Sequence, residues 1–176
     1  MNERIVPKEG EYDPYFVRYL KLIPEDTILM DLLVKQMETV EEEFLEMDEK
    51  WLRTPYQEGK WSPKELLLHI TDTERVMAYR ALCIGRGDLQ NLPGFDEDDY
   101  ASHSHGNVLS IDYLVEDFKQ TRKSILLLGH SFSEQDWQRV GSANGKNISP
   151  RAIVNILAGH FIHHMNILKE RYTRHV

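Results

Sequence analysis

The 176-residue chain of 20.7 kDa can bury one hydrophobic core and has little room for a second domain. Its hydrophobic fraction of 41% and charged fraction of 28% exclude collagen-like, mucin-like and wholly disordered proteins. Its formal net charge of −8 argues against the basic surface that binds nucleic acid or anionic membranes, so we expect neither partner.

A first long helix is predicted to begin near Asp26 and to run through Trp51, with Pro55 and Gly59 ending it. Apolar residues recur at alternating steps of three and four in this stretch, which is the spacing of one helical face. They are Met30, Leu33, Met37, Val40, Phe44, Met47 and Trp51.

A second helix is predicted to begin after Ser62 and to stop at Gly85. Ser62 can cap the first turn, Pro63 suits the first helical position, and Glu65 completes a capping box. No helix-breaking residue interrupts positions 66–84.

Residues 86–107 are predicted to form a long surface loop, because they contain glycines, Pro93 and no clear apolar period. The segment also carries an acidic run at 96–99 and the histidines His103 and His105. These side chains could hold a second metal ion. We favour a solvated loop, which could cover the mouth of the bundle.

The rest of the chain is predicted to contain two more long helices, at residues 110–129 and 149–172. Between them, a short helical turn is expected at 134–137. The pair Asn144-Gly145 favours a tight turn and a small hairpin within 139–148.

Together these elements predict an all-α protein, a four-helix bundle with a long loop between helices 2 and 3. That loop could be a crossover rather than a tight turn. Residues 1–25 are predicted to be an N-terminal extension, and residues 26–176 the bundle domain.

A cytoplasmic protein is expected, because residues 1–10 lack the apolar stretch of a signal peptide and no run of about 18 apolar residues occurs. Cys83 is the single cysteine, so an intrachain disulfide is impossible, and we interpret its thiol as buried and inert. A bound metal would therefore need His, Asp or Glu ligands, and the chain has eight histidines.

His160 and His164 lie one turn apart on the predicted fourth helix, which lets two imidazoles reach one metal ion. Their face is mostly apolar, so we expect it to point into the core. His163 falls on a more polar face and is a surface histidine or a fallback ligand. His69, on an apolar stripe of the second helix, could face the pair, and three neutral imidazoles would leave ligand positions open. The alternative for all three is a packing role.

Other residues have plainer interpretations. Asp72 could orient a histidine, but we favour a solvated acid or a partner of Arg75 or Arg80. Three tryptophans, Trp51, Trp61 and Trp137, are predicted to pack or cap helices, and they need not line a pocket.

The sequence resembles the DinB and YfiT-like superfamily of four-helix proteins over residues 26–172. The resembling motifs are residues 60–69 (KWSPKELLLH), residues 133–137 (SEQDW), and residues 149–152 (SPRA) leading to Gly159-His160 and His164. The resemblance implies a metal-binding bundle, often dimeric, in which His69, His160 and His164 ligate zinc or nickel. Some members are thiol S-transferases, some relatives are thiol-dependent isomerases, and many have no known activity.

The function expected from the sequence is therefore a metal-dependent thiol S-transferase. A divalent ion on the three histidines would lower the pKa of a low-molecular-weight thiol, which would attack an electrophilic substrate. Two alternatives stay open: a metal-dependent hydrolase that uses the same site, and a non-enzymatic dimeric stress or binding protein. No catalytic residue is assigned beyond the metal ligands, and a homodimer is expected from the resemblance.

Overall fold

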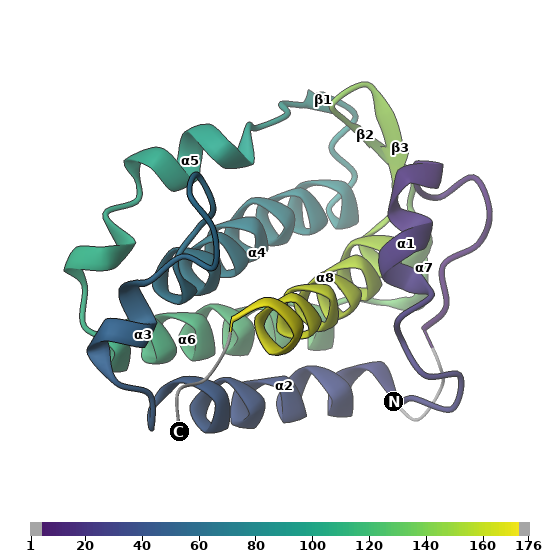
Figure 1. Ribbon diagram of the computed structural model, residues 1–176. Helices are drawn as coiled ribbons and strands as arrows, with labels where there is room; N and C mark the ends of the chain where they lie inside the picture. The colour runs from purple at the N-terminus through teal and green to yellow at the C-terminus, as the bar shows by residue number, and fades with distance from the viewer. Residues whose placement is uncertain (1–4, 173–176) are drawn as a thin grey trace.

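The computed structural model describes residues 5–172 and consists of four long helices packed side by side, with shorter elements at their ends (Figure 1). The long helices are α2 (Leu29–Phe44), α4 (Pro63–Gly85), α6 (Ile111–His130) and α8 (Pro150–Arg171). The predicted all-α bundle is confirmed. Across the described part of the chain, no helix combines the length and the apolar character needed to cross a membrane.

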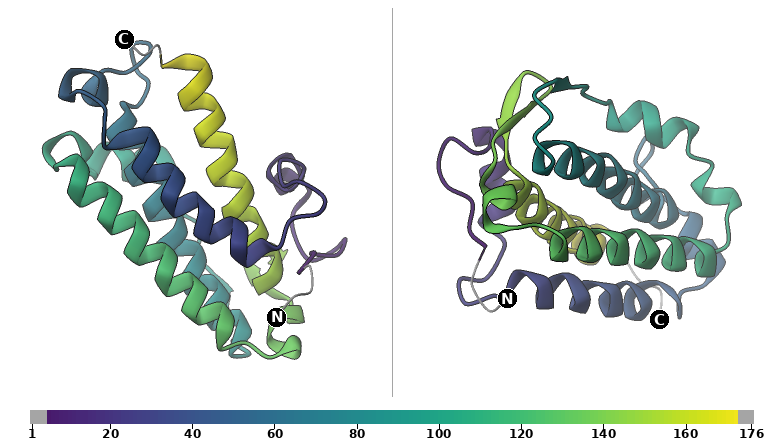
Figure 2. Two further views of the ribbon diagram at one scale, coloured as in Figure 1. Left: turned by 90° about the horizontal axis from the view of Figure 1, so that it is seen from below. Right: turned by 180° about the vertical axis from the view of Figure 1, so that it is seen from behind.

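Helices α4 and α6 run in the same direction, so the segment between them crosses the length of the bundle. At one end, Arg86 just after α4 donates to the Ser131 hydroxyl just after α6 over 2.9 Å. At the other end, the hydroxyl of Ser62, which caps α4, donates to Asn107 Oδ1 over 2.8 Å, shortly before α6 begins. The predicted crossover is confirmed, and α2 and α8 run the opposite way (Figure 2).

The predicted first helix is wrong in one respect, because the structure breaks it. Helix α2 ends at Phe44, and a separate short helix, α3 (Glu49–Arg53), follows. The Asp48 side chain accepts a hydrogen bond from Trp51 N over 3.0 Å and so caps a new helix. Trp51 is still buried, which is why the apolar spacing continued across the break.

The predicted starts of the other helices are confirmed by their capping contacts. At α4, Glu65 N donates to Ser62 Oγ over 3.2 Å and Ser62 N donates to Glu65 Oε2 over 2.7 Å. Ser110 and Ser149 cap α6 and α8 through their side chains, and Ser133 caps the short helix α7 (Glu134–Gln138).

The segment at 86–110 is more regular than predicted. It contains β1 (Asn91–Leu92), α5 (Glu97–His103) and the 3-10 turn η2 (Gly106–Val108). The Asp96 carboxylate accepts hydrogen bonds from the backbone amides Asp98 N and Asp99 N in the first turn of α5, both over 3.0 Å. The acidic run therefore forms the first turn of a helix, where negative charge is favourable. A helix of 7 residues is too short to display a clear apolar period.

The predicted hairpin is confirmed, with β2 (Gly141–Ala143) antiparallel to β3 (Lys146–Ile148). Asn144 and Gly145 adopt φ values of 51° and 71°, which are the left-handed conformations of a two-residue turn. Strand β1 pairs in parallel with β2, an addition that the sequence did not predict. The Asn91 side chain reinforces this pairing by accepting from Gly145 N over 2.9 Å.

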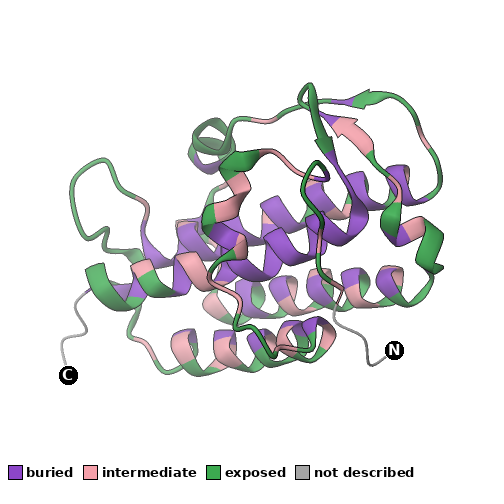
Figure 3. Cartoon of the chain, turned by 90° about the vertical axis from the view of Figure 1, so that its right-hand side faces the viewer, coloured by how far each residue is buried: buried purple, intermediate pink, exposed green. Residues whose placement is uncertain are grey.

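Two apolar clusters fill the bundle, each with residues from all four long helices, and a buried polar layer lies between them. Buried residues lie along the long helices of the bundle (Figure 3). Arg122 Nε on α6 donates to both carboxylate oxygens of Glu74 on α4, at 3.0 Å. Arg122 Nη1 donates to Gln36 Oε1 on α2 over 2.5 Å, and Gln36 Nε2 donates to Ala158 O on α8 over 2.9 Å. The polar layer thus joins the four helices near their middle.

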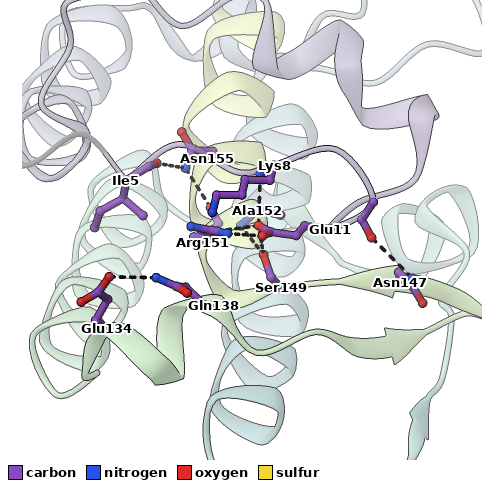
Figure 4. Close-up of polar contacts among 11 residues, drawn as sticks. Ile5, Lys8, Glu11, Glu134, Gln138, Asn147, Ser149, Arg151, Ala152 and Asn155 are labelled. Carbon is purple, nitrogen blue, oxygen red and sulfur yellow. Dashed lines mark hydrogen bonds and ion pairs between the residues drawn. The ribbon is translucent and has the colours of Figure 1, made fainter.

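Residues 5–25 form an N-terminal arm that contains η1 (Pro14–Phe16) and α1 (Val17–Leu20) and packs along α8. Its main attachment is Glu11, whose carboxylate accepts from Arg151 Nε over 2.5 Å and from Ser149 Oγ over 3.1 Å at the start of α8 (Figure 4). Asn155 Nδ2 also donates to Ile5 O over 2.7 Å. The arm is therefore fixed by the first turns of α8.

The attachment of the arm is expected to depend on pH. Burial raises the pKa of Glu11, but hydrogen bonds from Arg151 and from the Lys8 amide outweigh it, so the pKa lies below its ordinary 4.5. The folded carboxyl therefore holds its proton less tightly than the unfolded one. Its contribution to stability is present above pH 4.5 and is lost as the pH falls through the folded pKa.

We expect Glu11→Gln to weaken the attachment of the arm by about 1–3 kcal/mol at pH 7, because it leaves a buried Arg151 without its carboxylate. Hydrogen exchange at Ser149 N, which donates to Glu11 O over 3.0 Å, would measure this. The difference from wild type should shrink as the pH falls below 4.5 and through the lower folded pKa, where the wild-type carboxyl becomes protonated. Glu9→Gln, at an exposed position of the same arm, should behave as wild type. Equal exchange in Glu11→Gln and wild type at pH 7 would contradict the prediction.

Candidate metal centre

Three histidine side chains from two helices meet in the interior of the bundle. His69 Nε2, on α4, lies 3.2 Å from the Nε2 atoms of both His160 and His164, on α8. The latter two Nε2 atoms are 3.0 Å apart. The exposed fractions of the three residues are 9%, 6% and 8% in chain order. The structure therefore brings together the three histidines selected from the sequence, on an inward face as expected.

Aromatic rings on both sides restrict the orientation of these imidazoles. The Trp61 ring lies 4.5 Å from the His69 ring, centroid to centroid, and the Tyr19 ring lies 5.3 Å from that of His160. Trp61 packs against one of the two apolar clusters, as predicted, and it also lines the neighbouring cavity. Trp61 precedes the capping residue Ser62 and lies outside α4, so helical spacing gave no signal for this contact. Tyr19 belongs to the arm, and nothing in the sequence pointed it toward His160.

The three imidazoles are neutral at physiological pH. Burial lowers the pKa of His69 to about 4. Burial also lowers the pKa values of His160 and His164 well below 6.5, and the neighbouring imidazoles add to this effect. Neutral imidazole is the form that binds metal ions, so these nitrogens need not lose a proton first.

The donor set and its spacing fit a divalent ion such as zinc. A tetrahedral ion with nitrogen ligands at about 2.0–2.1 Å separates those ligands by about 3.3 Å, close to the observed 3.0–3.2 Å. The Nδ1 atoms of His160 and His164 have no hydrogen-bond partner among residues 5–172, so the polar contacts of both rings are concentrated at Nε2. Three neutral ligands leave further coordination positions open, as in catalytic rather than structural sites.

A cavity of about 540 Å³ opens onto the three histidines. Its walls come from α4, α8, the N-terminal arm, the segment before α5 and the β2–β3 hairpin. Apolar side chains such as Phe16, Met77, Phe95 and Ile156 line it together with the cations Arg18, Arg80 and Lys146. The volume is in the usual range for small-molecule sites.

Other candidate residues lie outside the histidine cluster. His163 lines the cavity and packs its ring 5.4 Å from that of Tyr19, and burial lowers its pKa. Asp72 accepts from Arg75 over 3.1 Å, which is one of the plainer roles predicted for it. Cys83 is a half-buried free thiol that does not line the cavity, so the expectation of a buried thiol is corrected.

The histidines of the crossover segment do not gather around a second site. His103 Nδ1 instead lies 2.8 Å from Asp99 O within α5, with its side chain exposed. Across residues 5–172, His69, His160 and His164 are the one group of three or more His, Cys, Asp or Glu side chains close enough to share an ion. The solvated interpretation of the acidic run is thus favoured.

Known proteins share this fold and part of this sequence. The model of the DinB superfamily matches residues 32–168. An Oceanobacillus iheyensis protein named "putative metal-dependent hydrolase" is 27% identical over 155 residues, which cover 84% of this chain and 88% of that protein.

Two solved structures superpose well on the bundle. The first is YfiT from Bacillus subtilis, which is called a probable metal-dependent hydrolase with an unusual four-helix bundle topology. It gives a TM-score of 0.71 at 15% identity, and the superposition covers 84% of this chain and 90% of the YfiT chain. The mycothiol-dependent maleylpyruvate isomerase gives 0.64 at 14% identity and covers 83% of this chain, which spans 61% of the isomerase chain. At these identities the likeness concerns the fold. The family match extends from α2 to the last turns of α8, and the chain belongs to the DinB superfamily.

Proposed function

We propose that His69, His160 and His164 bind one divalent ion, zinc or nickel, and that the protein is a metal-dependent enzyme acting in the adjoining cavity. The observation that carries this proposal is the meeting of three neutral Nε2 atoms within 3.2 Å of one another at the wall of a 540 Å³ cavity. A structural ion would need a closed ligand set, whereas this set is open toward the cavity.

The reaction that we propose is the transfer of a low-molecular-weight thiol to an electrophilic substrate. When bound, the ion supplies Lewis acidity that lowers the pKa of a coordinated thiol. The chain's own residues hold the ion, exclude water through the aromatic walls of Trp61 and Tyr19, and orient the substrate. The name of the isomerase neighbour, which is mycothiol-dependent, supports a thiol.

The polar surroundings of the histidines also favour a thiol. No carboxylate among residues 5–172 hydrogen-bonds to any of the three imidazoles. Activation of a water for hydrolysis benefits from a nearby general base, whereas a thiol is acidic enough to ionise without one. Hydrolysis is the second candidate, since the Oceanobacillus relative and YfiT are both named as metal-dependent hydrolases. The homodimer and the cytoplasmic location stay predictions from the sequence.

Metal content measures the first part of this proposal. We expect tag-free protein to contain about one zinc or nickel ion per chain by elemental mass spectrometry, and His69→Ala and His164→Ala to contain less than about a tenth of that, because two imidazoles bind an ion far more weakly than three. His130→Ala removes an exposed histidine at the end of α6 and should retain the ion.

Circular dichroism separates loss of metal from loss of fold in these variants. A His69→Ala protein that stays helical without metal supports an open site. Wild-type protein that neither contains metal nor takes up added zinc or nickel would overturn the proposal. The reaction is then tested with the metal-loaded protein, cysteine or coenzyme A, and 1-chloro-2,4-dinitrobenzene as a generic electrophile. Hydrolysis of p-nitrophenyl acetate without thiol-transfer activity would favour the hydrolase instead.

A further inference from the structure

Arg80 is a buried cation without an acidic partner. Its side chain is 7% exposed, Nη2 donates to Pro93 O over 2.6 Å, and Nη1 lies 3.3 Å from Met77 Sδ. No carboxylate among residues 5–172 forms an ion pair with it. A guanidinium offers five N–H donors, so three remain after these two contacts. Burial lowers the pKa of Arg80, as expected when no acid compensates the lost hydration.

The other buried arginines of the described chain behave differently. Arg122, which is fully buried, binds the Glu74 carboxylate through two nitrogens. Arg151, which is 9% exposed, binds the Glu11 carboxylate in the same forked manner. Buried charges are normally paired in this way. Arg80 departs from this rule, and it does so at the wall of the cavity that holds the three histidines.

Arg80 is placed to face the histidine cluster along one side of α4. His69, Thr73, Met77 and Arg80 follow each other at steps of four, four and three residues, and all four line the cavity. Eleven residues of helix separate the Cα atoms of His69 and Arg80 by about 16 Å along the axis. The guanidinium extends toward His69 from its Cα position, since Nη1 contacts Met77 Sδ, one helical turn nearer the histidine. Along the α4 wall of the cavity, Met77 therefore lies between His69 and Arg80.

The remaining charges of the cavity also favour an anion. Arg18, on α1, donates to the hydroxyl groups of Tyr15 and Tyr19 and has no ion pair with an acid in the described chain. Lys146 is paired with Asp13 at 3.3 Å, and Glu97 lies at the start of α5. Three cations thus face two carboxylates, although the whole chain carries a net charge of −8.

We propose that the cavity binds a carboxylate-bearing substrate, with the carboxylate on the guanidinium of Arg80 and the reacting end of the molecule at the three histidines. This inference rests on the proposed function for the reaction itself, but not for anion binding. A planar guanidinium with free N–H groups is matched to a carboxylate by geometry as well as by charge. The apolar side chains between the two ends fit a hydrocarbon or aromatic middle portion.

The test uses two probes of one shape and different charge, 3-phenylpropionate and 3-phenylpropionamide. They are titrated into metal-free protein prepared with a chelator, and the Nε–H resonance of Arg80 is followed by arginine-selective nitrogen NMR. We expect saturable shifts with the carboxylate and about tenfold weaker binding of the amide, because a hydrogen bond to a charged group is worth about 1.5 kcal/mol or more. Metal-free protein is used so that the carboxylate cannot bind the ion instead.

Variants of the chain locate the effect. Arg80→Gln should weaken binding of 3-phenylpropionate about tenfold, while Arg80→Lys, which keeps the charge but loses the fork, should show a smaller loss. Arg86→Gln, an exposed arginine just after the same helix, is the matched control and should bind like wild type. If Arg80→Gln fails to fold because the contact with Pro93 is lost, the comparison of the two probes on wild type and Arg80→Lys still decides.

The outcomes separate this inference from the proposed function. Equal affinities for the acid and the amide, or an Arg80→Gln protein that folds and binds the acid like wild type, would overturn the anion site, whatever the metal content. If wild-type protein contains and binds no metal but binds 3-phenylpropionate in a way that depends on Arg80, the metal proposal is overturned and the anion site is supported. The metal content of Arg80→Gln should equal that of wild type, since Arg80 does not contact the histidine nitrogens.

Discussion

Replacing Glu74 with glutamine is expected to destabilise the metal-free protein by about 3–5 kcal/mol, the cost of leaving a buried charge without its counter-charge. Both side chains of the Glu74–Arg122 pair are fully buried, so water cannot replace the lost carboxylate. Urea denaturation followed by circular dichroism, with a chelator present, would measure the change. The chelator is needed because bound metal would stabilise the folded state by mass action.

The double variant Glu74→Leu/Arg122→Met is the matched control, because it removes both charges and keeps apolar volume. Its stability is expected to lie much closer to wild type than that of Glu74→Gln, since apolar replacement of a whole buried ion pair is often neutral. In the double variant, Gln36 Oε1 loses its hydrogen-bond donor. We expect this loss, about 1–3 kcal/mol, to account for the remaining difference in stability from wild type. A loss below 1 kcal/mol in Glu74→Gln would contradict a tightly paired polar layer.

Replacing Gly159 with alanine is expected to push the N-terminal arm away from α8. A Cβ atom at this position would lie 2.2 Å from Tyr19 O and 2.6 Å from Tyr19 C, and these are backbone atoms that cannot rotate aside. Alanine should favour the helix by about 1 kcal/mol over glycine. We expect the overlap to reverse that gain and to produce a net loss of about 1–3 kcal/mol. Tyr19 would also leave its position against the His160 ring.

Hydrogen exchange at the arm and urea denaturation measure the two parts of this prediction. Exchange within α1 should rise, while the amides of α4 and α6 keep their protection. Gly129→Ala is the control, because a Cβ there meets only the ends of the Met30 and Trp137 side chains, at 3.0 and 3.2 Å. A Gly159→Ala protein with wild-type arm protection and higher stability would show that α1 does not depend on this close approach.

Much of this protein could be predicted from local patterns. Helix starts at Ser62, Ser133 and Ser149 were visible because capping is a contact between residues three apart, and the hairpin was visible because Asn144-Gly145 tolerate left-handed backbone. The histidine pair was visible for the same reason, since residues four apart on a helix share a face. The break between α2 and α3 and the helix α5 were missed. At the first place, Asp48 caps a new helix although the apolar spacing continues. At the second, Asp96 caps a helix of 7 residues that is too short to show an apolar period.

The four long helices, their packing as a bundle and the His160–His164 pair could be predicted from the sequence, because periodicity and spacing within a few residues indicate them. The approach of His69 to this pair and the other surroundings of the histidines depend on how the helices pack against one another. The tertiary structure joined Glu74 to Arg122, which lie 48 residues apart, and left Arg80, six residues after Glu74 on the same helix, without an acid. Pairing of buried charges depends on which side chains the packed helices bring face to face, and residue spacing along one helix carries no information about the opposite wall.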